Sequence, residues 1–492
     1  MTERDWENSR PFNIHRWSND PEVDAWTQDF WHQHLSIFYT QPKPGPQPKS
    51  SPRDQFKVLI LDLYLCWLED PEQCLAVSHA RSNYPANSRY NALPITPSVL
   101  FELISVMKGR RIVKVLKGHI TDKSQRIATR VWPLATLIEH FQSANFHDLQ
   151  IGELESLEPI ILRKDVGTKK ELVPYFDPSE AKGKEQSEKV IRANWKIPHM
   201  RKRLRAYNEL LRESFIDVAC LEEPYVRTRA KDQDSRGPKT LYQRISQHNK
   251  SVRRIFNRAS FEHGGRFYGG FWQRIGSELR SAIRINDEPT VELDYSAHHI
   301  RVAYANEGLI GPDDPYDLGE ILPEYEGNTA LQRKDVKSLT LICMNAKSPS
   351  NAFSSFRHRV KEAIEAGERT GEIPSLKLCK KLLNAFIERN PDIEVYMNSD
   401  KGIEFMNTDS RVSDRIIDHF VRQRIPILSI HDSYIVPAQY EDELREQMTK
   451  AFEDIIEVSN PYITKETHEP YTIAEGYRKR REDFQNWMKN RS

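Results

Sequence analysis

Two strand-like segments, each ending at an aspartate, constrain the fold of this chain more than any other feature. TVELDY at 290–295 alternates enough to form a strand, and IPILSI at 425–430 is an apolar run followed by the tight turn HDS and the returning segment YIVP. Asp294 lies near the end of the first strand, and Asp432 lies in the turn after the second. If the strands are neighbours in one antiparallel sheet, the two carboxylates meet at the same end of it.

Such a pair of carboxylates needs a cation, because two negative charges placed together repel each other. A pair of Mg²⁺ ions, or Mn²⁺ in their place, would remove this repulsion. The ions would then activate an attacking oxygen and stabilise a leaving pyrophosphate. Two unrelated aspartates at strand ends would be the simpler explanation of either strand alone, so the hypothesis depends on what lies between them.

A basic helix is expected between the two strands, over residues 333–350. Arg333 and Lys337 are four positions apart and therefore lie on one helical face. An apolar stripe lies behind them, formed by Leu339, Leu341, Ile342 and Met344. Two cations presented by one helix between two acidic strands suit a triphosphate. An ordinary exposed Arg/Lys pair is the alternative.

A region rich in basic and aromatic residues precedes the first strand. The whole chain has a formal net charge of only +1, but residues 196–290 contain 20 Lys and Arg against 11 Asp and Glu. Arg266 and Arg274 are interspersed there with aromatic residues such as Phe271 and Trp272. Basic residues mixed with aromatic ones suit a phosphate backbone and stacked bases, although a solvated helical face explains such a charge excess equally well.

These segments together resemble the conserved motifs of family A DNA polymerases and single-subunit phage-type RNA polymerases. DYSAHHIR at 294–301 is similar to the family's D-Y-S-Q-I-E-L-R, and Arg333 with Lys337 matches R-x-x-x-K. His431 and Asp432 match the family's H-D pair. GGRFYGGFWQRI at 264–275 resembles the G-R…Q-N-I segment that contacts the primer–template. The resemblance covers roughly residues 260–450, with four motifs in the family's order.

The resemblance implies a role for each matched position. Asp294 and Asp432 would be the catalytic metal ligands, joined by the backbone carbonyl of Tyr295. The nucleotide-binding residues would be Arg333, Lys337, His299, Asn345, Leu341 and Tyr295. The nucleic-acid contacts would include Arg266, Gln273, Arg274 and His431. His431 either orients the primer end or supports the turn, and Arg301 is expected to hold the palm through a structural ion pair.

The sequence departs from the family at the positions that shape the nucleotide pocket. His299 stands where the DNA enzymes have a glutamate that helps to exclude ribonucleotides, and Asn345-Ala346 stands in place of a Tyr-Gly pair. Leu341 occupies a position where an aromatic residue or Met is usual. The segment HDSY is closer to the RNA polymerases than to the DNA enzymes. The sugar of the substrate therefore stays open.

Several functions remain compatible with these motifs. The leading hypothesis is a nucleotidyltransferase acting as a template-directed DNA polymerase. A primase, a small RNA polymerase or a template-independent nucleotide-adding enzyme is the closest alternative. A replication factor that keeps the fold without activity is a second one, and a metal nuclease is more distant. The first 200 residues lack a convincing D-x-E constellation, so no proofreading exonuclease is expected.

The N-terminal part of the chain predicts a separate DNA-binding module. FKVLILDLYLCWLED at 56–70 is typical of a buried helix, and a second helix is expected over 96–109, with Thr96 as its N-cap and Pro97 in its first turn. Two short β-like runs follow around the polar turn TDKSQ. Helix, helix and basic hairpin is the order of a winged helix-turn-helix. Its DNA contacts would be Lys108, Arg110 and Arg111, although such a fold also serves protein contacts.

The predicted fold class is therefore α+β. A polymerase-like palm, an antiparallel sheet backed by helices, would follow an N-terminal winged helix. The expected divisions are an extension and linker over 1–53, the winged helix over 54–150, a linker over 151–195 and the polymerase domain over 196–492. Within the last, the palm would comprise 264–310 and 400–460, with small fingers over 325–395.

The remaining composition favours a cytoplasmic protein of DNA replication, such as one of a mobile element. The N-terminal segment has no apolar stretch of a secretory signal, and no apolar run reaches the ~20 residues that span a bilayer. The five cysteines are scattered without a C-x-x-C pair, which indicates reduced thiols. The expected partners are nucleic acid (primer–template DNA or RNA) and nucleoside triphosphates, with no membrane.

Overall fold

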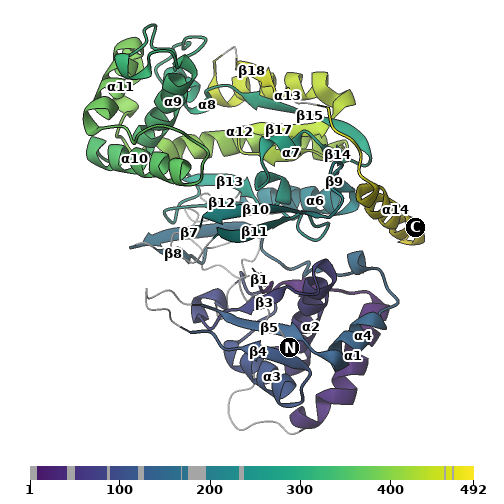
Figure 1. The fold of residues 1–492 in the computed structure, drawn as a ribbon. Coiled ribbons are helices and arrows are strands. Elements are labelled where there is room, and N and C mark those ends of the chain that lie inside the picture. The colour runs from purple at the N-terminus through teal and green to yellow at the C-terminus, as the bar shows by residue number, and fades with distance from the viewer. Residues whose placement is uncertain are drawn as a thin grey trace, which may run out of the picture. The chain divides into compact units, whose positions relative to one another are not determined.

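A computed structural model describes residues 8–40, 50–85, 89–119, 127–167, 169–175, 196–231, 238–458, 461–467 and 470–491. The chain divides into two compact units, residues 1–159 with 483–492, and residues 160–482. Figure 1 shows helices and mainly antiparallel sheets in both, so the chain is of the α+β class as predicted.

Unit 1 is built from short strands and longer helices. Its strands are β1 (Ser9–Pro11), β2 (Arg16–Trp17), β3 (Cys74–Val77), β4 (Val113–Leu116), β5 (Thr129–Pro133) and β6 (Gly152–Glu153). Its helices are α1 (Pro21–His34), α2 (Pro52–Glu69), α3 (Pro97–Gly109) and α4 (Ala135–Gln142), with 3-10 turns η1 (Ser36–Tyr39), η2 (Arg81–Asn83) and η3 (Asp148–Gln150).

Helix α2 is the centre of unit 1. Ser51 and Asp54 form a capping box at its start, and Pro52 occupies its first turn. Every residue from Gln55 to Cys66 is buried. Strands β4 and β5 pair antiparallel, with Val113 opposite Pro133, and the sheet order is β1-β3-β5-β4. The two predicted helices and the hairpin strands are therefore confirmed as elements, whereas the turn TDKSQ lies outside the described residues.

The N-terminal segment differs from the expected extension. Strand β1 pairs parallel with β3, and helix α1 contributes Val23, Trp26 and Phe30 to the core of unit 1. The proline-rich stretch that suggested a linker comprises residues 41–49, which lie outside the described part of the chain. The apolar stripe of α1 recurs at helical spacing, so the sequence did carry the signal of a packed helix.

Unit 2 begins with a strand-rich part. Its elements are β7 (Ile160–Val166), β8 (Lys169–Leu172), α6 (Ile197–Glu213), β9 (Ile216–Val218), β10 (Tyr225–Lys231), β11 (Pro238–Arg244), β12 (Arg253–Phe256), β13 (Gly264–Tyr268), α7 (Ser277–Arg280) and β14 (Ile283–Ile285). The unit continues with β15 (Glu288–Tyr295), α8 (His298–Asn306), α9 (Thr329–Asn345), α10 (Pro349–Glu365), α11 (Leu376–Arg389), α12 (Gly402–Arg422), β16 (Leu428–Ile430), β17 (Ser433–Pro437), α13 (Glu441–Ile456), β18 (Ile463–Lys465) and α14 (Glu475–Arg491), whose last residues count with unit 1. Short 3-10 turns are η5 (Phe271–Gln273), η6 (Pro323–Tyr325), η7 (Pro391–Tyr396) and η8 (Ala438–Tyr440).

The central sheet of unit 2 carries both aspartate strands side by side. Its order is β16-β17-β15-β14-β9, all antiparallel, and β18 pairs with the end of β15. Helix α13 packs on this sheet, where the Tyr295 hydroxyl donates to the backbone carbonyl of Met448. Helix α12 packs against α13 and presents Val412, Ile416 and Phe420 to the core. An antiparallel sheet backed by helices is thus observed (Figure 1).

Part of the predicted linker over 151–195 is ordered sheet. Strand β7 pairs parallel with β12 through Ile160–Leu162, and these three residues are buried. The sheet order is β13-β12-β7-β8. A run of three apolar residues inside a charged stretch is too short to show the period of a strand. Residues 176–195 of that linker lie outside the described residues.

Helix α9 packs against α10, α11 and α12, and Figure 1 shows α9, α10 and α11 grouped beside the central sheet. Asn328 caps α9 by accepting from the amide of Leu331. Buried Asp335 accepts from Arg369 and from the hydroxyl of Tyr325, which ties α9 to the loop before it. These contacts bury one side of α9 and leave the opposite side exposed.

Candidate active site

The structure brings Asp294 and Asp432 together at one end of the central sheet. Asp294 lies opposite Ser433 in the β15–β17 register, and the amide of Tyr295 donates to the carbonyl oxygen of Asp432 at 3.2 Å. His431 has a φ of 60°, a left-handed conformation that His adopts more readily than most residues. This conformation closes the tight β16–β17 turn that carries Asp432.

Both carboxylates are held in an environment that disfavours their charge. Burial and the charge of Asp432 raise the pKa of Asp294 to about 8, and Lys337 offsets part of this rise. Burial and the charge of Asp409 raise the pKa of Asp432, against the opposite effect of Arg266. A site that holds two carboxylates under these conditions favours a cation as its ligand.

A third carboxylate, Asp409 of α12, lies in the same cluster and was not predicted. It is 1% exposed and accepts from the Nε of Arg266, a residue of β13. The Nη2 of Arg266 also donates to the Nε2 of His299 at 2.9 Å. Burial and the positive charge of Arg266 lower the pKa of His299 to about 3, so this ring is neutral and accepts.

Several buried polar atoms of this cluster keep unused hydrogen-bonding capacity. Among the described residues, neither ring nitrogen of His298 has a hydrogen-bond partner. The Oδ1 of Asp409 and the Nδ1 of His431 also lack one within the described part of the chain. The His298 Nε2 lies 3.9 Å from that Oδ1. Buried polar atoms are nearly always paired. These four atoms are therefore exceptions within the cluster around the two aspartates.

The exposed side of α9 carries the predicted nucleotide residues at successive four-residue steps. Arg333, Lys337, Leu341 and Asn345 recur at that spacing and share one face. No carboxylate in the described ranges lies within ion-pair distance of Lys337, whose charge nevertheless lowers the pKa of Asp294. The Asn345 side chain donates to the carbonyl of Leu341, on the same face. Lys337 is thus a cation within electrostatic reach of the acid pair.

Arg333 is held by Asp314, an acidic partner that was not predicted. The guanidinium makes a bidentate ion pair with Asp314, with 3.1 Å from Nη2 to Oδ1, and lies 5.7 Å from the ring centre of Tyr316. Tyr316 is buried, and the charge of Asp432 contributes to the raised pKa of its hydroxyl. Tyr316 is therefore near Arg333 of α9 and within electrostatic reach of Asp432.

The segment predicted to contact a primer–template is largely committed to internal contacts. Arg266 forms the ion pair described above, and the Gln273 side chain donates to the carbonyls of Phe267 and Ser429. Arg274 is exposed. The side chains of Arg266 and Gln273 are therefore held by internal contacts, and Arg274 is the one of these three residues that is exposed to solvent.

Three further predicted residues have mixed outcomes. The side chain of Tyr295 is buried and bonded to Met448, so only its backbone faces the acid pair. The His431 ring packs edge-on against Tyr268 at 5.4 Å. Arg301 does hold the fold, but it donates to the backbone carbonyls of Ser296 and Asp313. No carboxylate of the described residues lies within ion-pair distance of it, so the expected ion pair is not seen and neutral carbonyl oxygens satisfy the guanidinium.

In unit 1, Lys108, Arg110 and Arg111 are all exposed at the end of α3. No described carboxylate lies within ion-pair distance of any of the three, and the Arg110 guanidinium lies 5.6 Å from the ring centre of Phe38. These residues form an accessible basic surface of unit 1.

The pKa of Asp294 predicts how the metal-free protein responds to pH. A carboxyl group whose pKa is raised on folding stabilises the fold below its unfolded pKa and loses that contribution as pH rises through about 8. We expect the free energy of unfolding to fall between pH 5 and 9 by a few kcal/mol at most, because a tenfold change in proton affinity corresponds to about 1.4 kcal/mol. Asp294→Asn should flatten this fall in urea titrations, whereas Glu388→Gln, which removes an exposed carboxylate of α11, should leave it unchanged.

Comparison with known proteins identifies no family for this chain. No protein-family model matches it, and no curated protein matches its sequence significantly. Among the described residues, none of the helices combines the length and apolar character that a membrane crossing requires.

Proposed function

We propose that the chain is a nucleotidyltransferase that adds a nucleotide to a nucleic-acid 3′ end, acting as a template-directed DNA polymerase. The observation that carries the proposal is the meeting of Asp294, at the end of β15, with Asp432, in the turn that leads into the adjacent strand β17, within electrostatic reach of Lys337. A metal nuclease would need the two acids but would leave the basic face of α9 without a role.

The acid pair fits Mg²⁺. No group of three or more His, Cys, Asp or Glu side chains within the described ranges is arranged to hold a metal. Mg²⁺ sites in polymerases commonly use one or two carboxylates together with substrate phosphates. Asp294, Asp432 and the carbonyl of Tyr295 would hold the ions. When bound, two such ions activate the 3′-hydroxyl and stabilise the leaving pyrophosphate; Mn²⁺ would substitute.

The residues of α9 would bind the triphosphate. Lys337 is exposed and has no ion pair with a described carboxylate, so its ammonium can neutralise charge that grows on the leaving phosphate. Arg333 is half exposed and paired with Asp314, and it would reach a phosphate by exchanging that carboxylate for it. Leu341 and Asn345, farther along the same face, would contact the base or sugar, because a side chain on the same stripe points the same way.

An RNA-making enzyme is the second candidate, and one observation favours it. His299 is neutral and held by Arg266, so no negative charge stands at the position where the related DNA enzymes exclude ribonucleotides. A neutral ring does not repel or displace a 2′-hydroxyl as a carboxylate would. A primase or small RNA polymerase therefore stays the alternative.

Unit 1 would supply DNA binding as a winged helix. Helix α3 precedes the antiparallel pair β4–β5, and the strand order β3-β5-β4 places β4 at the edge of the sheet. Lys108, Arg110 and Arg111 would then contact phosphates. A triple alanine variant of these residues should weaken duplex binding while leaving transfer on a short primer–template unchanged.

Extension of a labelled primer–template with Mg²⁺ tests the proposal. Deoxynucleotides and ribonucleotides are supplied separately, and lanes without primer and without template run beside them. Extension dependent on primer and template with deoxynucleotides supports the polymerase, and ribonucleotide products select the RNA-making alternative. No product in any lane, from protein that still binds nucleic acid, would contradict nucleotidyl transfer.

Loss of Lys337 should impair transfer more than loss of a similar exposed lysine. We expect Lys337→Ala to lower kcat/KM for the nucleotide about 100-fold, within the range for one electrostatic contact to a developing charge. Lys361→Ala on α10, also exposed, is the matched control and should change kcat/KM less than about threefold, as expected for a weak surface ion pair. Steady-state extension kinetics with equal effects of both variants would remove Lys337 from the site.

A further inference from the structure

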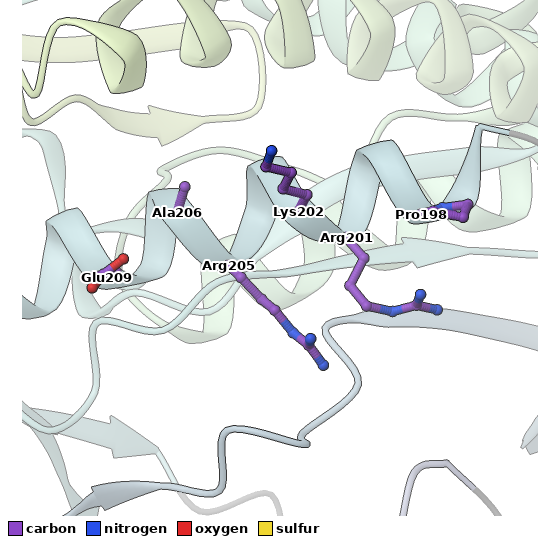
Figure 2. A pocket seen from close by; sticks show the side chains of 6 residues that line it. All are labelled: Pro198, Arg201, Lys202, Arg205, Ala206 and Glu209. Carbon is purple, nitrogen blue, oxygen red and sulfur yellow. The ribbon is translucent and has the colours of Figure 1, made fainter. Parts of the chain in front are cut away.

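The outer side of α6 forms a hollow that shares no residue with the candidate active site. Figure 2 shows its lining side chains, which all come from α6. The hollow has a volume of about 470 Å³. It is lined by Pro198, Arg201, Lys202, Arg205, Ala206 and Glu209. Their spacing of three and four residues places them along one face of the helix.

The basic residues of α6 lie on two sides of the helix, an inner side that packs on α12 and an outer side that is exposed. On the inner side, Arg203 pairs with Asp414 and lies 3.9 Å from Asp418 of α12, and the Tyr207 hydroxyl donates to the carbonyl of Ile427 at 2.7 Å. On the outer side, Lys202 and Arg205 are exposed, and no described carboxylate lies within ion-pair distance of either. Arg203 therefore holds the fold, whereas Lys202 and Arg205 are available to a ligand.

The chemistry of the hollow indicates a polyanion. Its lining includes three cations and one carboxylate, and only Pro198 and Ala206 are apolar. Sites for small organic ligands are mostly apolar and enclose their ligand. In Figure 2, Arg201 and Arg205 extend to one side of the helix and Lys202 extends to the other. Arg201 is largely buried, so Lys202 and Arg205 are the exposed cations of the hollow. Repeated positive charge along an open surface suits the repeated charge of a phosphate backbone.

We propose that the Lys202–Arg205 face of α6 binds the phosphate backbone of a nucleic-acid strand at a site distinct from the acid pair. Nucleic acid as the partner rests on the proposed function. Glu209 lies at the far end of the hollow and repels phosphate, so it marks where the strand leaves the helix. The surface supplies charge without base contacts, so binding here is independent of sequence.

The test is binding of a labelled single strand and of a duplex to the full chain, measured by fluorescence anisotropy over a range of salt concentrations. The variant Lys202→Ala/Arg205→Ala should weaken binding at least tenfold at low salt. Its slope of log affinity against log salt should be shallower by about 1.4 to 1.8, since each phosphate contact contributes about 0.7 to 0.9. Thermal unfolding should not change, because both side chains are exposed.

The control is Lys380→Ala/Lys450→Ala, which removes two exposed lysines of α11 and α13 that have no ion pair with a described residue. Equal losses in both double variants, an unchanged slope in the α6 variant, or equal competition by polyglutamate of matched charge would overturn the proposal.

Asp432→Asn should bind with the wild-type slope. A wild type that fails to extend primers but shows the α6-dependent slope contradicts only the proposed function, whereas extension with an unchanged slope contradicts only this inference.

Discussion

Asp432→Asn is expected to reduce nucleotide transfer at least about 1,000-fold, equivalent to about 4 kcal/mol of transition-state stabilisation. The substitution keeps the shape of the side chain but removes one of the two charges that would bind metal ions. Folding should not suffer. Burial and the charge of Asp409 already raise the pKa of Asp432, so a neutral side chain relieves repulsion. The metal-free variant should therefore be at least as stable as the wild type at pH 8.

Single-turnover extension and urea unfolding at the same pH measure the two effects together. Glu466→Gln is the matched control, because its exposed carboxylate also raises the pKa of Asp294 but is not part of the pair. We expect Glu466→Gln to change transfer less than about threefold, as for a screened surface charge. Transfer by Asp432→Asn within tenfold of the wild type would show that Asp432 does not act on the reacting groups.

Asp409→Ala is expected to destabilise the fold by about 3–5 kcal/mol, the cost of removing one partner of a buried ion pair. Asp409 is 1% exposed, and the Arg266 side chain is 13% exposed, so the arginine charge would lose its nearest counterion without gaining water. His299 would remain bonded to Arg266 but cannot neutralise it, since its ring is neutral. The loss should appear as a lower urea midpoint at an unchanged slope.

Two further variants separate charge from packing at this position. Asp409→Asn keeps an acceptor for Arg266 and should cost less than Asp409→Ala. The double variant Asp409→Leu/Arg266→Met removes both charges and should recover much of the loss, since apolar pairs of similar volume often replace buried ion pairs without penalty. If Asp409→Ala changes stability by less than about 1 kcal/mol, the level of an exposed pair, the buried ion pair is not the support of this cluster.

The sequence predicted those parts of the site in which residue types and their period agree. The alternation of TVELDY predicted a strand that ends near Asp294, the segment HDS predicted a turn that carries Asp432, and the four-residue step placed Arg333 and Lys337 on one face. Local period specifies which face of its own element a side chain occupies. That the two aspartates meet was predicted only on the condition that the strands are neighbours, and the pairing of β15 with β17 meets that condition. The helices and hairpin strands of unit 1 followed from the same signals.

The rest could not be predicted from local patterns. Asp409 is one acidic residue within an amphipathic helix, and only the packing of α12 against β13 shows that it meets Arg266. Tyr316 and Asp314 lie in a loop with no period. Arg266 and Gln273 were assigned to nucleic acid from the resemblance of GGRFYGGFWQRI to a family motif, and a sequence does not show whether such a side chain is free or hydrogen-bonded internally. Their hydrogen bonds become visible only in the folded chain.

The most direct test of the account is the number of Mn²⁺ ions that the full chain binds in the presence of a dideoxy-terminated primer–template and the matching nucleotide. Electron paramagnetic resonance titration measures it without requiring turnover. We predict about two ions per complex for the wild type, as in two-metal transferases, and a loss of this binding in Asp294→Asn/Asp432→Asn. Equal Mn²⁺ binding by the wild type and the double variant would contradict a metal site at these two carboxylates.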